Sequence, residues 1–248
     1  MKAMFDELQG KQIVAADGIA GVISDILIDD RFWGTNYFVV ETRPLPPGQS
    51  VLIAAEAMLP YSPHNKYLSV RHSIDHIQNA PPLKERQPIS KHYEQKLQTH
   101  FQWMIPPFLF ASTPLASQHG AIVDKEIIAD IAARYEPYGH LRSVQEMIGY
   151  NIESEFERVG KVWNLAFYLE NWATALFVID IGESNRVSKK IPMSPAWIQN
   201  ISWPDKKIQI DLPQDVFLSS PLFKHEQLNE RFMDKKMYEH YRTYLSTG

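Results

Sequence analysis

The sequence predicts a mainly β protein (β plus α) made of two small antiparallel β-barrels in tandem, each followed by short helices. Three observations predict this fold. The second half of the chain repeats the first, short apolar segments are separated by turn residues rather than by helices, and serines that favour helix N-termini follow the last strand of the first half.

The composition is that of an ordinary globular protein. The chain has 248 residues, 44% hydrophobic and 22% charged, with a net charge of −4 and no cysteine. The acidic balance argues against a direct contact with nucleic acid, and the missing cysteines exclude disulfides and cysteine-based metal sites. The N-terminus has no apolar signal region, and no apolar run approaches the roughly 20 residues of a membrane helix. We therefore expect a cytoplasmic protein without a transmembrane segment.

The internal repeat relates the two halves by an offset of 139 residues. It runs without a gap from Leu8 to Thr42 and still holds at Ala57, which matches Ala196. One inserted residue then changes the offset to 140. The period has the size of a domain, which indicates a duplication rather than a solenoid. The identical pairs in the first stretch include Gly10 with Gly149, Gly21 with Gly160, Trp33 with Trp172, Thr35 with Thr174 and Phe38 with Phe177.

We call the first half of the repeat copy one and the second half copy two. Copy one contains a series of short predicted strands. The turn Asp17-Gly18 separates the first two, and Thr35 to Thr42 is the clearest strand pattern in the chain. Short strands that are joined by turns rather than by helices are typical of an antiparallel barrel. The remaining strands are predicted at residues 13–15, 22–28, 51–54 and 67–71 in copy one, and at 152–153, 162–168, 174–181, 190–193 and 207–212 in copy two.

Helices are predicted after the last strand of each copy. Ser73 and Ser90 are suitable N-caps for a short and a longer helix in copy one. Copy two has the corresponding helices at 213–218 and 228–244. Residues 103–139, rich in proline and aromatic residues and then helical in pattern, form a linker. The predicted domains are therefore 1–102, 103–139 and 140–248.

The turn and strand pattern of copy one resembles the PRC-barrel family, named after a domain of the photosynthetic reaction-centre H subunit and similar to the C-terminal domain of a ribosome-maturation factor. The resemblance covers most of the chain outside residues 104–138. Copy two departs from the pattern at two turns, because it has residues 155–158 in place of Asp17-Gly18 and residues 169–171 in place of residues 29–31. The residues that carry it are Gly10, Asp17-Gly18, Gly21, Asp25 to Asp30, Trp33 and Tyr37 to Thr42, with the tail Pro81-Pro82, His92-Tyr93-Glu94 and His100-Phe101, and the phrase His140 to Ser143.

The resemblance implies an assembly or interaction module, and it brings no catalytic residues. Three alternatives stay open. A non-catalytic module binds a protein partner or self-associates, with a homodimer as one form. A sensor binds a small ligand or a metal in the cleft between the barrels. A docking protein associates with the ribosome.

Polar clusters that could carry chemistry have simpler explanations. Asp25, Asp29 and Asp30 could bind a cation, but they lack the spacing of a calcium loop and fit a solvated turn. His72 and His76 have helical spacing, yet copy two has no counterpart, so surface histidines are favoured. We therefore predict no catalytic residue, no cofactor and no metal. His100 and His240 match across the repeat and could cap the long helices.

Exposed aromatic residues are the remaining candidates for a partner-binding surface. Trp33 and Trp172 begin the main strand of each copy, where they either pack in the core or anchor a partner. Trp103, Phe108 and Phe110 lie in an apolar stretch of the linker, which packs between the barrels or mediates dimerisation.

Overall fold

The structure is a computed structural model that describes residues 1–42, 49–61, 65–83, 89–102, 140–155, 157–182, 189–230, 235–237 and 239–241. The predicted linker, residues 103–139, lies outside the described residues. The candidate residues Trp103, Phe108 and Phe110 lie outside them too.

Two compact units make up the chain, and their residues interleave. The copy-one unit contains residues 7–145 and 169–173, and the copy-two unit contains residues 1–6, 146–168 and 174–248. The predicted domain ranges are contiguous, whereas each observed unit also takes a short segment from elsewhere in the chain. The N-terminus in particular belongs to the copy-two unit.

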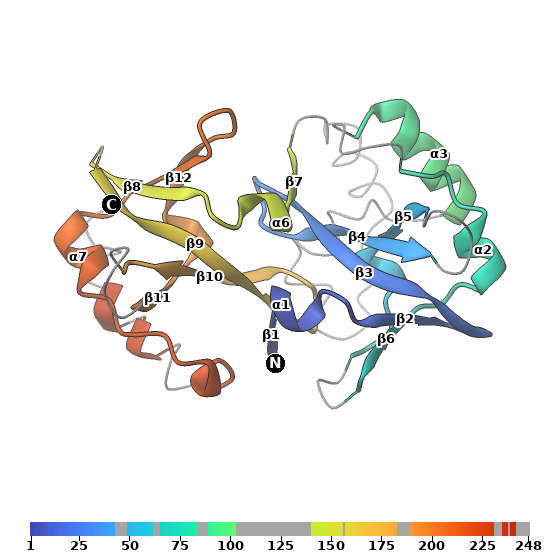
Figure 1. The fold of residues 1–248 in the computed structure, drawn as a ribbon, viewed down its shortest axis with the longest axis horizontal. Coiled ribbons are helices and arrows are strands. Elements are labelled where there is room, and N and C mark those ends of the chain that lie inside the picture. Colours follow the sequence, from blue (N-terminus) through green and yellow to red (C-terminus); the bar gives the residue numbers. More distant parts are fainter. Residues whose placement is uncertain are drawn as a thin grey trace, which may run out of the picture. The chain divides into compact units, whose positions relative to one another are not determined.

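The copy-one unit holds a six-stranded sheet with the order β5-β4-β3-β2-β6, in which β7 pairs with the end of β3 on the edge opposite β4 (Figure 1). The pair β2 and β6 is parallel, and the others are antiparallel. Its elements are β2 (Gln12–Ala15), β3 (Gly18–Asp29), β4 (Thr35–Thr42), β5 (Ser50–Ala54), the 3₁₀ helix η1 (Ala55–Ala57), β6 (Tyr67–Ser69), α2 (Ile74–Gln78), α3 (Lys91–Phe101) and β7 (Leu141–Ser143).

The copy-two unit holds a seven-stranded sheet with the order β11-β10-β9-β8-β13-β12, in which β1 pairs with β9. Here β8 and β13 are the parallel pair. Two short helices, α1 (Phe5–Leu8) and α6 (Val144–Met147), carry the chain from one unit to the other. The elements of this unit are β1 (Lys2–Met4), β8 (Asn151–Ser154), β9 (Glu157–Tyr168), β10 (Thr174–Asp180), β11 (Lys190–Met193), η2 (Pro195–Trp197), β12 (Ile198–Ser202), β13 (Lys207–Ile210), α7 (Gln214–Leu218) and η3 (His225–Gln227).

The mainly β class is confirmed, but neither sheet closes into the predicted antiparallel barrel. β5 and β11 lie at the ends of their strand orders, and each is followed by a 3₁₀ helix. After this helix, Met58 forms an isolated bridge with Val70 in the copy-one unit, whereas β12 pairs with β13 in the copy-two unit. The sheets are also mixed, because each contains one parallel pair.

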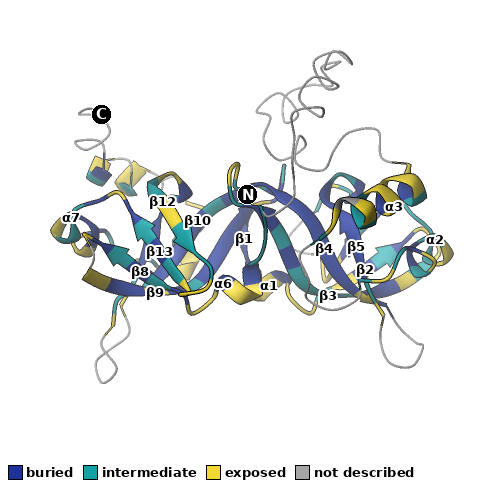
Figure 2. Ribbon diagram, turned by 90° about the horizontal axis from the view of Figure 1, so that it is seen from above, coloured by how far each residue is buried: buried dark blue, intermediate teal, exposed yellow. Residues whose placement is uncertain are grey.

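The core of each unit lies on its long central strands. Every residue of β4 except Glu41 is buried, and Figure 2 shows β10 buried along most of its length in the same way. Helix α3 is attached to the copy-one sheet by Tyr37, whose buried hydroxyl donates a 2.7 Å hydrogen bond to Glu94. Burial raises the pKa of the Glu94 carboxyl.

The register of the strands places the inserted residue earlier than the sequence alignment does. Glu41 pairs with Ser50 and Asp180 with Lys190, so Ser50 and Lys190 are equivalent at an offset of 140. The insertion therefore lies in the loop before β5 and β11. Ala57 consequently corresponds to Trp197, the last residue of η2, instead of Ala196.

Candidate functional site

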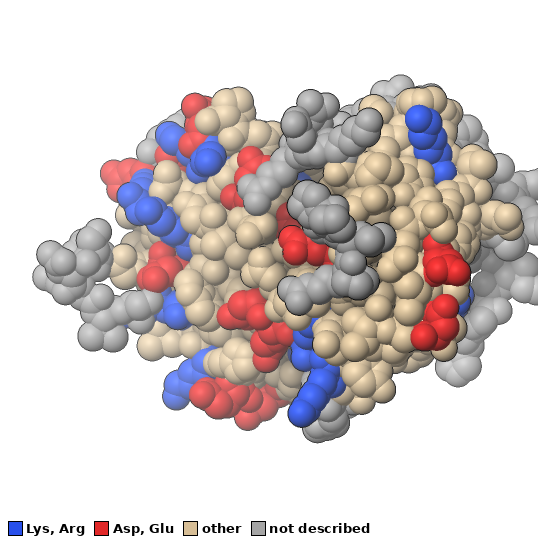
Figure 3. Space-filling view, turned by 45° about the vertical axis from the view of Figure 1, so that its right-hand side comes forward, with Lys and Arg blue, Asp and Glu red and all other residues tan. Residues whose placement is uncertain are grey.

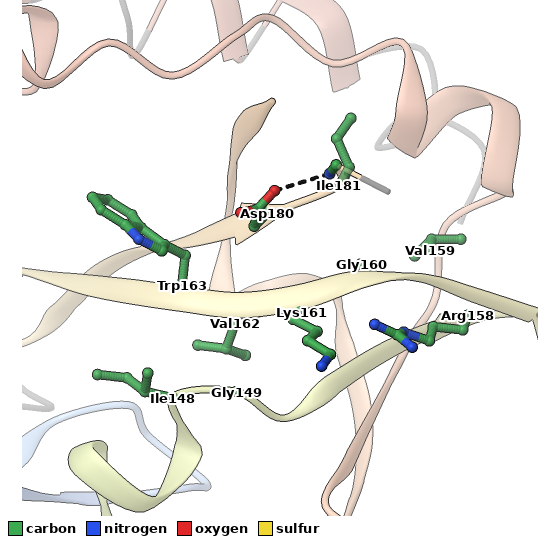
Figure 4. Close-up of a pocket in the computed structure, with 11 residues that line it drawn as sticks. Ile148, Gly149, Arg158, Val159, Gly160, Lys161, Val162, Trp163, Asp180 and Ile181 are labelled. Carbon is green, nitrogen blue, oxygen red and sulfur yellow. Dashed lines mark hydrogen bonds between the residues drawn. The ribbon is translucent and has the colours of Figure 1, made fainter. Parts of the chain in front are cut away.

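A hollow of about 520 Å³ lies over β9 in the copy-two unit. The turn at Ile148 and Gly149 forms one flank and the end of β10 forms the other, with Arg158 and Lys161 extending on the same side of the strand (Figure 4). Ligand pockets commonly have volumes of roughly 300–1,000 Å³. We call it the β9 hollow; its lining residues are Ile148, Gly149, residues 158–163, Asp180, Ile181 and Gly182.

A β-bulge positions the indole of Trp163 at this hollow. Val178 pairs with Asn164 and Ile179 with Val162, which leaves Trp163 without a partner on β10. Bulges redirect side chains and are frequent beside functional sites. The indole packs against the buried cluster that contains Met4, and the Lys190 ammonium lies 3.5 Å from its ring centroid. This cation–π contact fixes a positive charge beside the aromatic ring.

Cationic side chains predominate at the hollow. Asp180 lies between Lys161 and Lys190 in adjacent strands, and its carboxylate accepts a hydrogen bond from the Gly182 N–H at 2.9 Å. Arg158 and Lys161 are exposed and form no ion pair with any described residue. Two cationic lining residues, Arg158 and Lys161, therefore accompany one carboxylate, and Lys190 adds a charge at the Trp163 ring. On the face shown in Figure 3, by contrast, basic and acidic residues occur in small mixed groups.

The equivalent positions in copy one are uncharged. Under the repeat, Arg158 corresponds to Ile19, Lys161 to Val22 and Lys190 to Ser50. The bulge itself is present in both sheets, because Ser24 is skipped between Ile23 and Asp25 just as Trp163 is. The shared fold therefore does not require these side chains.

None of the site residues predicted from the sequence is among the lining residues of the β9 hollow. The signal in the sequence is the difference between the copies, because Trp163 replaces Ser24 and two cations replace apolar residues. Identities between the copies report the common fold and therefore do not indicate this site.

The two predicted tryptophans have different environments. Trp172 is only 3% exposed and belongs to the copy-one unit, where it contacts Phe38 and Tyr61. It packs as a core residue, which was one of its two predicted roles. Trp33 is half-buried. Both have positive φ angles, 58° and 59°, which bulky residues seldom adopt.

The acidic turn of copy one is not solvated, so the interpretation as a solvated turn is wrong. Asp29 is fully buried and pairs with Arg31 at 2.8 Å. Asp30 binds His140 and Arg142 at 2.8 and 2.7 Å, and so fixes the strand β7. The carboxylate of Asp25 accepts hydrogen bonds from the Ser143 hydroxyl and the Gln145 N–H. The acids therefore bind the segment 140–145.

The predicted histidines pack between helices instead of lying free on the surface. The rings of His72 and His76 are 4.9 Å apart, and burial lowers the pKa of His72. The His100 Nε2–H donates to the carbonyl of His76 in α2, and the His240 Nε2–H donates to the carbonyl of Val216 in α7. The matched histidines thus cap the short helices rather than the long ones, because their rings reach back to the preceding element.

Burial of Glu56 is expected to make the stability of the copy-one unit depend on pH. Burial raises the pKa of its carboxyl from 4.5 to about 7, and Arg71 opposes this shift. Since the folded state holds this proton above pH 4.5 and the unfolded state does not, stability falls as the pH rises from 4.5 to 7. We expect Glu56→Gln to raise the free energy of unfolding at pH 8 by about 1–2 kcal/mol, allowing for solvent screening, and to change little at pH 4. Urea unfolding at both pH values measures this, and an equal effect at both would contradict it.

Comparison of the sequence with protein-family models found no match, and comparison with curated proteins found none either. Within the described residues, no helix has the length and apolar character needed to cross a membrane. No group of three or more histidine, cysteine, aspartate or glutamate residues that could hold a metal ion occurs in the described part of the chain.

Proposed function

We propose that this protein is a non-catalytic interaction module of the PRC-barrel type, and that the β9 hollow binds an acidic segment of a partner protein. The observation that carries the proposal is the restriction of the cationic side chains to one of two equivalent sheets. Requirements of folding apply to both copies alike, so a difference of this kind supports a role in binding. The resemblance to a family of assembly modules agrees with this choice.

The chemistry of the hollow favours carboxylates on the partner. Arg158 and Lys161 can donate charge-assisted hydrogen bonds to carboxylate oxygens, which accept from both side chains. Ile148, 37% exposed, and the indole of Trp163 offer apolar surface for a neighbouring side chain. Asp180 opposes the dense negative charge of a nucleic acid backbone, as does the net charge of −4.

A peptide-display selection tests the proposal. We expect full-length protein to enrich peptides that combine Asp or Glu with an apolar residue. The variant Arg158→Glu/Lys161→Glu should bind these peptides at least about tenfold more weakly, because reversed charges repel the carboxylates. Binding should also weaken in 0.5 M salt.

The matched control is Lys206→Glu/Lys224→Glu. It changes the net charge by the same amount in the same unit, at two exposed positions that do not line the hollow. This control should keep the wild-type affinity. Equal binding by the Arg158→Glu/Lys161→Glu protein, or equal loss in the control, would contradict the proposal.

A small anionic ligand is the second candidate, and the volume of about 520 Å³ favours it because this volume suits a compact molecule. A library of small carboxylates and phosphates, screened by thermal shift, would detect it as a stabilisation that the Arg158→Glu/Lys161→Glu variant loses. Ligand-induced stabilisation without peptide binding would favour this candidate over the first.

A further inference from the structure

The N-terminal strand is bound in the copy-two unit through its main chain. Lys2 pairs with Tyr168 at the end of β9. On its other side, the side chain of Asn229 accepts from the Lys2 N–H at 2.5 Å and donates to the Lys2 carbonyl at 3.0 Å. Strand pairing and an amide clamp together recognise an extended backbone irrespective of its side chains.

Met4 anchors the same strand in the core. Its side chain is fully buried in a cluster with Ala166, Leu176, Val178 and Leu228. The Lys2 ammonium lies 5.5 Å from the ring centroid of Tyr168, so its aliphatic part lies beside that ring. We call the surface that receives this strand the β1 seat; it is formed by residues 166–168, Leu176, Val178, Leu228 and Asn229.

Each sheet is completed by the first strand of the other copy. β1 begins copy one and pairs with β9, while β7 begins copy two and pairs with β3. The registers are equivalent, since Lys2 opposite Tyr168 corresponds to Leu141 opposite Asp29 at the offset of 139. The module therefore takes its last strand from a segment that is not its own continuation.

The two strands are held by different chemistry. Ion pairs of Asp30 with His140 and Arg142 fix β7. The residue equivalent to Asp30 in copy two is Leu169, which cannot form such pairs. The contacts of the β1 seat with its strand include main-chain pairing, the Asn229 side chain and the apolar anchor Met4.

We propose that the β1 seat is a strand-binding site that also works in trans, and that its occupant is the N-terminal strand of a second copy of this chain. Such an exchange keeps every hydrogen bond and the Met4 anchor, and it changes only which chain supplies the strand. Trp163 of the β9 hollow packs against the Met4 cluster, but strand binding at the β1 seat does not depend on the function proposed for the hollow.

Disulfide trapping tests the proposal, because the chain has no native cysteine. One full-length variant carries Lys2→Cys, and a second carries Tyr168→Cys with Met4→Asp, which places a charge in the apolar cluster and empties the seat. Directly opposed residues of antiparallel strands are close enough for a disulfide. When the two are mixed under mild oxidation, we expect the covalent heterodimer to exceed the control at least tenfold.

The control replaces Tyr168→Cys by Ile19→Cys, an exposed position that does not pair with β1. An added peptide of residues 1–9 should suppress the cross-link by occupying the seat. A peptide of residues 140–145 should not suppress it, because Leu169 stands where copy one has Asp30, the partner of His140 and Arg142.

Cross-linking at the control level, with both proteins folded by circular dichroism, would overturn the proposal. If Met4→Asp prevents folding, Lys2→Pro in the Tyr168→Cys chain serves instead, since proline lacks the N–H that binds Asn229. An unsuppressed cross-link in the presence of the 1–9 peptide would equally count against the seat.

Discussion

Replacing Trp172 with alanine is expected to lower the free energy of unfolding by about 3–5 kcal/mol, the range for truncation of a large buried aromatic residue. The indole is 3% exposed, and it meets the ring of Phe38 edge-on at 4.9 Å and stacks on Tyr61 at 6.3 Å. Alanine leaves a cavity between these rings. Urea denaturation followed by circular dichroism measures the loss.

Two further variants separate packing from backbone strain. Trp33→Ala, at the half-buried equivalent position, should cost less than Trp172→Ala. Trp172→Gly should be about 1 kcal/mol more stable than Trp172→Ala, because glycine accepts a φ of 59° without steric cost. Wild-type stability of the Trp172→Ala protein would contradict the role of this residue in core packing.

Replacing Gly21 with alanine is expected to lower the free energy of unfolding by about 3 kcal/mol, near the upper end of the range for overpacking. A Cβ at this position would lie 2.3 Å from the Glu41 carbonyl oxygen and 2.8 Å from a methyl carbon of Val40. The oxygen belongs to the paired strand β4, so the two strands would have to separate. Thermal and urea unfolding of Gly21→Ala would show the loss.

The other repeated glycines serve as graded controls. Gly160→Ala should cost less than Gly21→Ala, because its added carbon would lie 2.8 Å from the nearest backbone oxygen. Gly10→Ala meets no atom within 4 Å and pays only for its positive φ of 80°, about 1 kcal/mol. An equal loss in all three would show that steric contact with the paired strand is not the cause.

Local features of the fold could be predicted because local sequence encodes them. Thr35–Thr42 is a strand as predicted, and Ser73 and Ser90 cap α2 and α3 by accepting from the N–H groups of His76 and Tyr93. Strand exchange could not be predicted. β1 has three residues and its partner strand lies about 160 residues further on, so no periodic pattern links them.

The environments of the tryptophans could not be predicted either, because they depend on residues that are distant in the sequence. The burial of Trp172 depends on Phe38 and Tyr61, which lie more than 100 residues earlier in the chain. Conversely, Trp163 fits a strand pattern and looks like a core residue until the pairing shows that it occupies a bulge. Side-chain type alone does not distinguish these two tryptophans.

The exchange of strands also imposes an order on folding during synthesis. β1 is translated before β9, so its place opposite Tyr168 exists only after the later strand has been made. At roughly 5–20 residues per second this interval is about 10–30 s. Meanwhile Met4 and Phe5 remain beside the charged residues Lys2, Asp6 and Glu7, which oppose aggregation of a short apolar segment. The β1 segment therefore stays without its partner strand until the second copy leaves the ribosome.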